Sequence, residues 1–253
     1  MKRCIFPILI ALLAMTVGSC NFSKPDYSTL SKSELRKLDE QGDAQASLQL
    51  GRMAIKDMDR SSAKKYFTKA ADQNIPEGLH NLALINLVEH ELFKNVADSI
   101  EAINNLQKAV DTDFIPSKGL LAFMIFGSHQ TNRRVEATRL AEEAANEGHK
   151  LGYFALALDQ IQSQGLHIVQ GDRADELMDK AISAGSGYAL VLKVNQYLNG
   201  RNSQDDICAE IEKYRDQYPM LLERLNRVVK GDNQAMQDNY FTERYFLIED
   251  WME

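Results

Sequence analysis

A ten-residue frame recurs along this chain and constrains its fold more than any other feature. The first copy is Gly42-Asp43-Ala44-Gln45-Ala46-Ser47-Leu48-Gln49-Leu50-Gly51. Later copies begin at Asn74, Asp113, Gly148 and Gly185, which gives spacings of 32, 39, 35 and 37 residues. Periods of this length are typical of arrays of helical hairpins, because one hairpin cannot bury its apolar face alone and must stack on its neighbours.

Each copy carries the same pattern of side-chain sizes after its turn residue. The position four residues later is always small: Ala46, Gly78, Ser117, Gly152 and Ala189. The position eight residues later is leucine in four copies: Leu50, Leu82, Leu121 and Leu156. Positions four apart share one face of a helix, and small residues there let two helices approach closely. Lys193 breaks the pattern in the fifth copy.

A second periodic helix is expected before each of the later turn residues, over residues 63–71, 102–110, 137–145 and 174–182. Each segment ends in small or apolar residues, such as Ala70 and Ala71. Glycine or asparagine directly after a helix suits the left-handed residue that closes it. The sequence therefore predicts about five two-helix hairpins stacked into one array.

The frame at Gly42, followed by a helix that ends Lys69-Ala70-Ala71, resembles the Sel1-like repeat, a relative of the tetratricopeptide repeat. The resemblance covers roughly residues 42–200. The middle copies depart from it, because alanine replaces the glycine of the tenth position at residues 83, 122 and 157. It implies an all-α, right-handed α-solenoid that scaffolds protein complexes.

The N-terminus has the features of an export signal. Two basic residues precede an apolar run from Ile5 to Val17, which is too short to span a bilayer comfortably. Val17-Gly18-Ser19-Cys20 resembles the lipobox of bacterial lipoproteins, which implies cleavage between Ser19 and Cys20 and acylation of Cys20. The alternative is an ordinary secretory signal with a chance cysteine at its end.

The residue after Cys20 is Asn21 and not the aspartate of the inner-membrane retention signal. The lipoprotein resemblance therefore implies an exported protein that is anchored by lipid to the bacterial envelope, at the outer membrane facing the periplasm. Several acyl chains on one residue would give stable attachment.

The predicted division of the chain has four parts. Residues 1–19 form the signal peptide, 20–33 a polar tether, 34–200 the repeat array and 201–253 a C-terminal helical cap, which includes a weak sixth frame at Gly231. In the cap, Phe241, Tyr245 and Ile248 share one helical face. We expect this aromatic tail to close the open end of the array. The alternative is a ligand-binding aromatic patch.

Charge and cysteine content narrow the possible partners. The formal net charge is −7, and removal of Lys2 and Arg3 with the signal leaves 27 basic residues against 36 acidic ones, or −9. This balance argues against binding to nucleic acid, which requires a basic surface. Loss of Cys4 and lipidation of Cys20 would leave Cys208 alone, so no intramolecular disulfide is expected. We interpret Cys208 as a buried thiol, with intermolecular pairing as the alternative.

No catalytic, cofactor-binding or metal-binding residue is predicted. None of the five histidines is spaced with another histidine or with a cysteine as a metal site requires: His80, His90, His129, His149 and His167. Acidic pairs such as Asp57 and Asp59 lie near expected helix boundaries, where they cap first turns. Gly185-Ser186-Gly187 lacks the third glycine of a dinucleotide site and is interpreted as a repeat turn.

Two segments, 79–88 and 120–126, are apolar around most of a helix. We interpret them as helices buried within the array, with an apolar groove for a partner as the alternative. The function predicted overall is an envelope scaffold that binds a protein or peptide partner, at residues that the sequence does not identify. The alternative is an enzyme or enzyme accessory acting on cell-wall glycan, although no acid and base pair is evident.

Overall fold

The computed structural model describes residues 25–93, 96–128, 131–163, 171–199, 203–232, 234, 248 and 250–252. The predicted signal peptide, with Ser19 and Cys20, lies outside this part. The described residues contain helices and no strand, which confirms the all-α prediction. The α-helices are α1 (Lys32–Glu40), α2 (Ala44–Lys56), α3 (Arg60–Asp72), α4 (Pro76–Phe93), α5 (Val96–Asp111), α6 (Ile115–Gly127), α7 (Arg134–Asn146), α8 (Lys150–Ser163), α9 (Arg173–Ser183), α10 (Gly187–Asn199), α11 (Gln204–Glu212) and α12 (Pro219–Val229), with a 3₁₀ turn, η1 (Thr131–Arg133), before α7.

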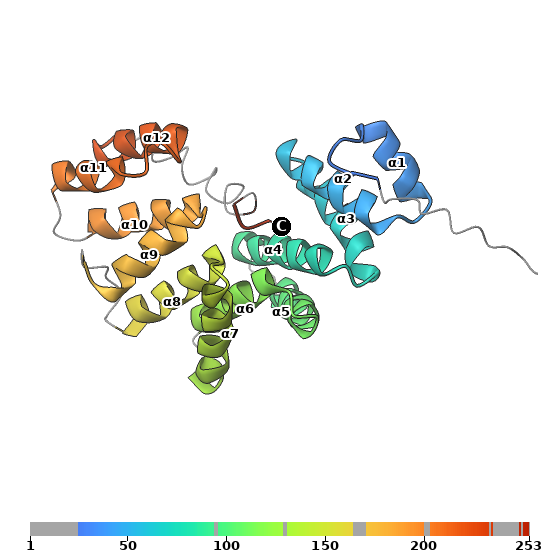
Figure 1. Ribbon diagram of the computed structural model, residues 1–253, viewed down its shortest axis with the longest axis horizontal. Coiled ribbons are helices and arrows are strands. Elements are labelled where there is room, and N and C mark those ends of the chain that lie inside the picture. Colours follow the sequence, from blue (N-terminus) through green and yellow to red (C-terminus); the bar gives the residue numbers. More distant parts are fainter. Residues whose placement is uncertain are drawn as a thin grey trace, which may run out of the picture.

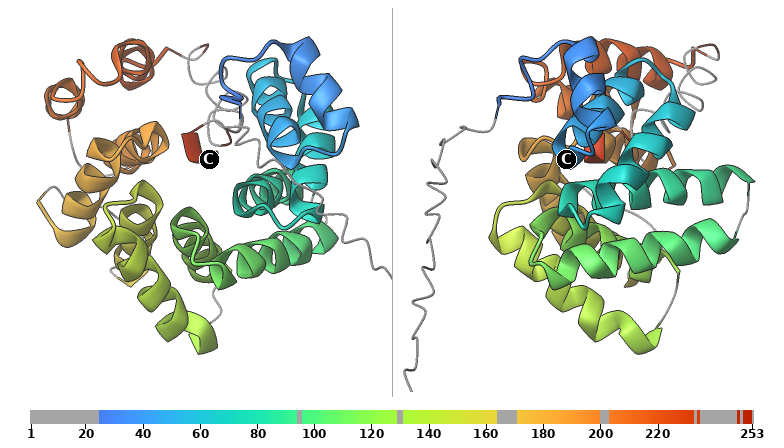
Figure 2. Two further views of the ribbon diagram at one scale, coloured as in Figure 1. Left: turned by 45° about the vertical axis from the view of Figure 1, so that its right-hand side comes forward. Right: turned by 90° about the vertical axis from the view of Figure 1, so that its right-hand side faces the viewer.

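Consecutive helices pair as hairpins, and the hairpins stack into a curved α-solenoid (Figure 1). The pairs are α2 with α3, α4 with α5, α6 with α7, α8 with α9 and α10 with α11, while α1 precedes the first pair and α12 follows the last. Figure 2 shows the array curving around the C-terminal end of the chain. We call the first helix of each pair an inner helix and the second an outer helix.

The turn that precedes each of the first five inner helices is the same: the first joins α1 to α2, and the other four join an outer helix to the next inner helix. The five turn residues have positive φ: Gly42 at 87°, Asn74 at 56°, Asp113 at 64°, Gly148 at 76° and Gly185 at 105°. At Asn74, for example, its N–H donates to the carbonyl of Ala71 at 2.8 Å, and the N–H of Ile75 donates to that of Ala70 at 3.2 Å. This pair of bonds is the Schellman motif. The predicted left-handed residue is therefore confirmed.

The sixth frame, which is weak in the sequence, forms the same turn. Gly231 has a φ of 84°, and its N–H donates to Val228 while that of Asp232 donates to Arg227. The Asp232 carboxylate then accepts from the N–H of Gln234 at 3.0 Å. Asp43 caps α2 in the same way, since it accepts from Gln45 N–H at 2.9 Å. The sixth frame therefore keeps the turn and the capping aspartate although its apolar pattern is weak.

The small position lies where an inner helix crosses the preceding outer helix. A Cβ added at Gly152 would lie 2.2 Å from the backbone nitrogen of Ala145, and one at Gly78 would lie 2.6 Å from the Cβ of Ala70. Contacts this short are forbidden, so only hydrogen fits at these two positions. The predicted close crossing of helices is confirmed at both.

Most side chains of the two apolar segments are buried, as the first interpretation predicted, while Leu87 and Phe123 are half-buried. In α4, Leu84 and Ile85 have no exposed surface, and in α6 the same holds for Leu120 and Leu121. Among the described residues, no helix is long and apolar enough to cross a membrane. Cys208 in α11 is half-buried, forms no disulfide and packs against the core.

Candidate binding groove

The end of the chain lies on the concave side of the array and contacts four inner helices. Its described residues, Ile248, Asp250, Trp251 and Met252, are called here the C-terminal segment. They form one helical turn, because the N–H of Met252 donates to the carbonyl of Ile248 at 2.9 Å. Figure 2 shows this turn surrounded by the array. The predicted aromatic tail begins at Phe241, but Phe241 and Tyr245 lie outside the described part; its described residues lie on the concave side and not at the open end of the array.

Trp251 is the centre of an aromatic cluster. Its side chain is fully buried. The ring centroid lies 5.0 Å from Phe123 of α6, 5.1 Å from Phe154 of α8 and 5.4 Å from Tyr188 of α10. The three ring pairs are edge-on, with interplanar angles of 67° to 80°, an arrangement that aromatic quadrupoles favour. Successive inner helices therefore each contribute one ring to a single aromatic pocket.

The carboxylate of Asp250 binds the beginning of α10. It accepts hydrogen bonds from Ser186 Oγ at 2.9 Å, from the N–H of Gly187 at 3.0 Å and from that of Tyr188 at 3.3 Å. First-turn N–H groups have no partner within their own helix, and the helix dipole favours a negative charge there. Burial nevertheless raises the pKa of Asp250, because desolvation outweighs the nearby charge of Lys150 and these hydrogen bonds.

Two side chains bind the main chain of the segment. His80 of α4 donates from Nε2 to the carbonyl of Trp251 at 2.9 Å, and its Nδ1 lies 3.1 Å from the Ser117 hydroxyl. A carbonyl only accepts, so Nε2 of His80 carries a proton. Lys150 of α8 donates from Nζ to the carbonyl of Asp250. Both contacts bind main-chain carbonyls of the C-terminal segment, so they do not depend on the side chains of that segment.

These contacts define the site that the C-terminal segment fills, called here the concave groove. Its side chains come from α4, α6, α8 and α10 and from the residue directly before α10: His80, Phe123, Lys150, Phe154, Tyr188 and Ser186. It combines an aromatic pocket, a carboxylate site at the N-terminus of a helix and two donors for main-chain carbonyls. Grooves that bind helical peptides use apolar anchors together with a few directed polar contacts. The arrangement can therefore hold a short segment of polypeptide.

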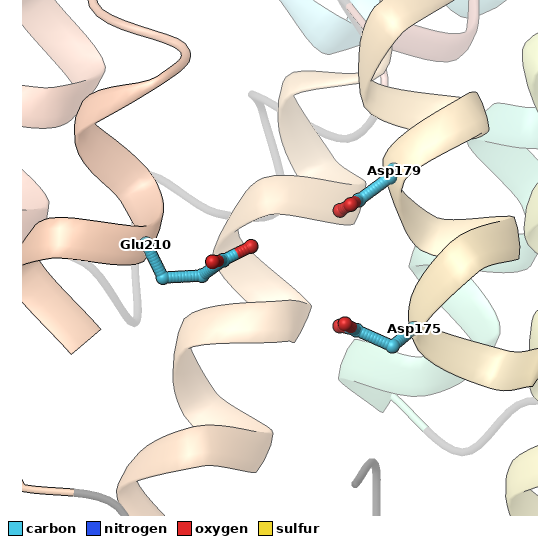
Figure 3. Close-up of side chains that lie close together, drawn as sticks. All are labelled: Asp175, Asp179 and Glu210. Atoms are coloured by element: carbon cyan, nitrogen blue, oxygen red, sulfur yellow. The ribbon is translucent and has the colours of Figure 1, made fainter. Parts of the chain in front are cut away.

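A second cluster gathers three carboxylates of α9 and α11, namely Asp175, Asp179 and Glu210, which face one another in Figure 3. The ammonium of Lys193, which is fully buried in α10, lies among them. It is 2.9 Å from Asp175 and 3.1 Å from Glu210, and it also pairs with Asp179. A lysine therefore occupies the position where carboxylates spaced in this way could hold a cation.

Neighbouring groups complete this ion cluster. The hydroxyl of Tyr197 donates to Asp175 at 2.6 Å and that of Tyr214 to Asp179 at 2.5 Å. Burial raises the pKa of both phenols, and the adjacent carboxylates raise it further. Burial alone would also raise the pKa of Asp179, but hydrogen bonds from Lys193, Tyr214 and Lys213 lower it overall. Lys193, Lys213 and the two phenols thus bind all three carboxylates, and the cluster packs against the core.

The other residues that the sequence analysis considered for catalysis or metal binding cap helices, form local hydrogen bonds or belong to the groove. Asp59 caps α3, since it accepts from the N–H of Ser62 at 3.0 Å. His149 accepts at Nδ1 from the N–H of Leu151 at 3.3 Å, while His80 belongs to the groove. The side chains of His90, His129 and His167 lie outside the described part. Lys193, which breaks the leucine pattern, is explained by the ion cluster.

Comparison of the structure with solved structures identifies the fold. A protective antigen present in uropathogenic Escherichia coli strains, described as displaying an SLR fold, superposes with a TM-score of 0.53 at 19% sequence identity. The match covers 87% of this chain. This chain has the SLR fold. The SLR (Sel1-like repeat) architecture is the one that the frame at Gly42 predicted.

The SLR match covers 49% of the antigen, so this chain spans about half of the length of that protein. A Sel1 repeat protein from Oxalobacter formigenes is also similar, with 18% identity, coverage of 85% of this chain and 99% of that one, and a TM-score of 0.47. Searches by sequence against family models and against curated proteins give no match.

The groove of this SLR array has no counterpart among the residues that the sequence predicts to be functional. Gly185-Ser186-Gly187 is a repeat turn, as predicted, but its Ser186 hydroxyl and Gly187 N–H also bind Asp250. The available signal was Trp251, the one tryptophan of the chain, in an aromatic-rich tail. Periodicity could not place that tail, because its contacts lie as far as 171 residues away along the chain.

Proposed function

We propose that this protein is a lipid-anchored recognition scaffold of the bacterial envelope, which binds a protein or peptide partner in its concave groove. The observation that supports recognition is the groove itself, in which four inner helices hold a peptide turn through its side chains and its carbonyls. Resemblance to Sel1-like repeats supports a scaffold role. Resemblance of residues 17–20 to a lipobox supports the lipid anchor.

The alternative, an enzyme or accessory acting on cell-wall glycan, needs an acid and a base that face a substrate cleft. A hollow of about 650 Å³ lies between α7, α8 and α9, and Glu142 and Asp159 are among its lining residues. Asp159, however, pairs with Arg134 at 2.8 Å. No observation among the described residues favours catalysis over recognition.

Partner capture tests the recognition role. We expect crosslinking and pull-down from detergent-extracted envelopes to recover a specific protein with the native chain. Phe123→Ala combined with Lys150→Glu should lose that protein, since one change removes an aromatic wall of the groove and the other reverses a charge. The matched control is Val135→Ala, because Val135 on α7 is 86% exposed. Equal recovery with both variants, or recovery of no protein, would contradict the proposal.

Processing of the N-terminus tests the anchor. We expect Cys20→Ala to abolish labelling by radioactive palmitate and to leave the signal peptide attached, which electrophoresis detects as a larger product. Cys208→Ala is the control and should be labelled and cut as the native chain is. In density-gradient fractionation, the native protein should sediment with the outer membrane. Normal cleavage of the Cys20 variant would refute the lipobox assignment.

A further inference from the structure

We infer that the concave groove is specific for a short helical turn in which an acidic residue is followed directly by an aromatic one, with an apolar residue two positions before the acid. The C-terminal segment, with Ile248, Asp250 and Trp251, is an intramolecular example of that ligand, and a partner carrying the same pattern displaces it. This inference rests on the proposed function and names the class of partner segment.

The groove contains two kinds of contact, and only one kind selects a sequence. His80 and Lys150 bind carbonyl groups, which every peptide offers. The carboxylate site presents the Ser186 hydroxyl and the Gly187 N–H as donors, and the Asp250 side chain reaches both of them from its position in the turn. Next to it, the aromatic pocket holds one planar ring, against which Phe123, Phe154 and Tyr188 pack edge-on. The carboxylate site and the aromatic pocket lie side by side, and together they select an acidic residue followed by an aromatic one.

Ile248 supplies the third part of the pattern. Its side chain is 1% exposed and packs in the main core. The hydrogen bond from the N–H of Met252 to the carbonyl of Ile248 closes one helical turn, so the two residues lie on the same side of it. An apolar side chain two residues before the acid is therefore held on the array at the same time as the carboxylate and the ring.

The contact between the C-terminal segment and the groove has two unfavourable features, which would help a partner segment to displace it. Nε1 of Trp251 is buried without a hydrogen-bond partner among the described residues. Leaving a buried donor unsatisfied is unfavourable. Burial also raises the pKa of Asp250, so the charged carboxylate is held at an energetic cost. The segment remains bound because its attachment to the chain gives it a high effective concentration, which a free competitor must overcome.

Fluorescence of the native, full-length chain tests displacement without any mutation, because Trp251 is its one tryptophan. The probe is a synthetic peptide of residues 244–253 carrying Trp251→Phe, which contains no tryptophan. We expect saturating peptide to shift the emission to the longer wavelengths of a solvent-exposed indole. The same peptide carrying Asp250→Asn in addition should need a concentration roughly tenfold higher, because it loses charge-assisted hydrogen bonds.

Binding in trans provides a second measurement. The full-length chain carrying Asp250→Lys and Trp251→Ala should release its own segment and keep the groove. We expect it to bind a fluorescein-labelled native peptide of residues 244–253 at least about tenfold more tightly than the native chain does, as measured by anisotropy. Adding Tyr188→Ala should abolish this gain. Circular dichroism confirms that each variant is folded before its affinity is compared.

Several outcomes would overturn the inference. One is a folded double variant that binds the peptide no better than the native chain; another is equal binding of the acidic and the Asp250→Asn peptides. A concentration-dependent dimer of the native chain that the double variant no longer forms would assign the groove to the segment of a second copy. Partner capture without peptide binding would refute the inference and leave the proposed function. Peptide binding without partner capture would contradict the proposed function but leave the sequence preference of the groove.

Discussion

Replacing Lys193 with leucine should destabilise the protein by about 3–5 kcal/mol, although leucine restores the repeat pattern. Lys193 is fully buried and pairs with Asp175, Asp179 and Glu210. Without its ammonium, the carboxylates repel one another in a poorly solvated site, and Lys213 reaches only Asp179 and Glu210. For a chain of this size the melting temperature should fall by roughly 10 °C, measured by circular dichroism.

The control for this substitution is an exposed ion pair. Lys32 pairs with Asp57 at 2.7 Å, and the two side chains are 40% and 57% exposed. Lys32→Leu should change stability by less than about 1 kcal/mol, because water solvates both partners. Lys193→Leu combined with Asp175→Asn should recover part of the loss, since Asp175 is the most buried of the three acids. A Lys193→Leu chain as stable as the native one would show that the cluster is not charged as described.

Gly152→Ala should cost about 3 kcal/mol and lower the melting temperature accordingly. The added Cβ would lie 2.2 Å from the nitrogen of Ala145, 2.6 Å from the carbonyl carbon of Ala144 and 2.8 Å from the carbonyl oxygen of Ala141. All three are backbone atoms, so no side chain can rotate away and α7 must separate from α8. Thermal unfolding followed by circular dichroism measures the effect.

Gly127 at the end of α6 offers the matched control for this glycine. A Cβ at Gly127 would meet nothing within 4 Å. Gly127→Ala should therefore be neutral or stabilising by up to about 1 kcal/mol, because alanine favours the helix and restricts the unfolded chain. If the two alanine variants melted at the same temperature, the close crossing of α7 and α8 would be contradicted.

The fold could be predicted from the sequence because its determinants are local. Each turn residue with positive φ and the small residue four positions later lie at one junction between consecutive helices, and this junction is repeated, so the copies support one another. Asn74 and Asp113 could be aligned with glycines because these residue types tolerate the left-handed region better than others. Lys193 was recognised only as a deviation, since its partners lie on two other helices.

The groove could not be predicted because most of its residues have no common sequence pattern. His80 and Phe154 share a position, six residues after the turn residue, but Phe123, Lys150, Ser186 and Tyr188 lie at four other positions. Only the curvature of the array brings them around one turn of chain. The tail is rich in aromatic residues, but the pattern does not predict where it binds, because Trp251 and its partner His80 are 171 residues apart in the sequence.

The position of the C-terminal segment also changes how the array should unfold. In an open solenoid each repeat contacts only its neighbours, so stability is a sum of local terms and the ends open first. Here one turn, at the end of the chain, joins α4, α6, α8 and α10, including a hydrogen bond between residues 171 apart. Opening any of these four helices breaks a contact shared with the other three. The central hairpins therefore form one cooperative unit for as long as the segment is bound.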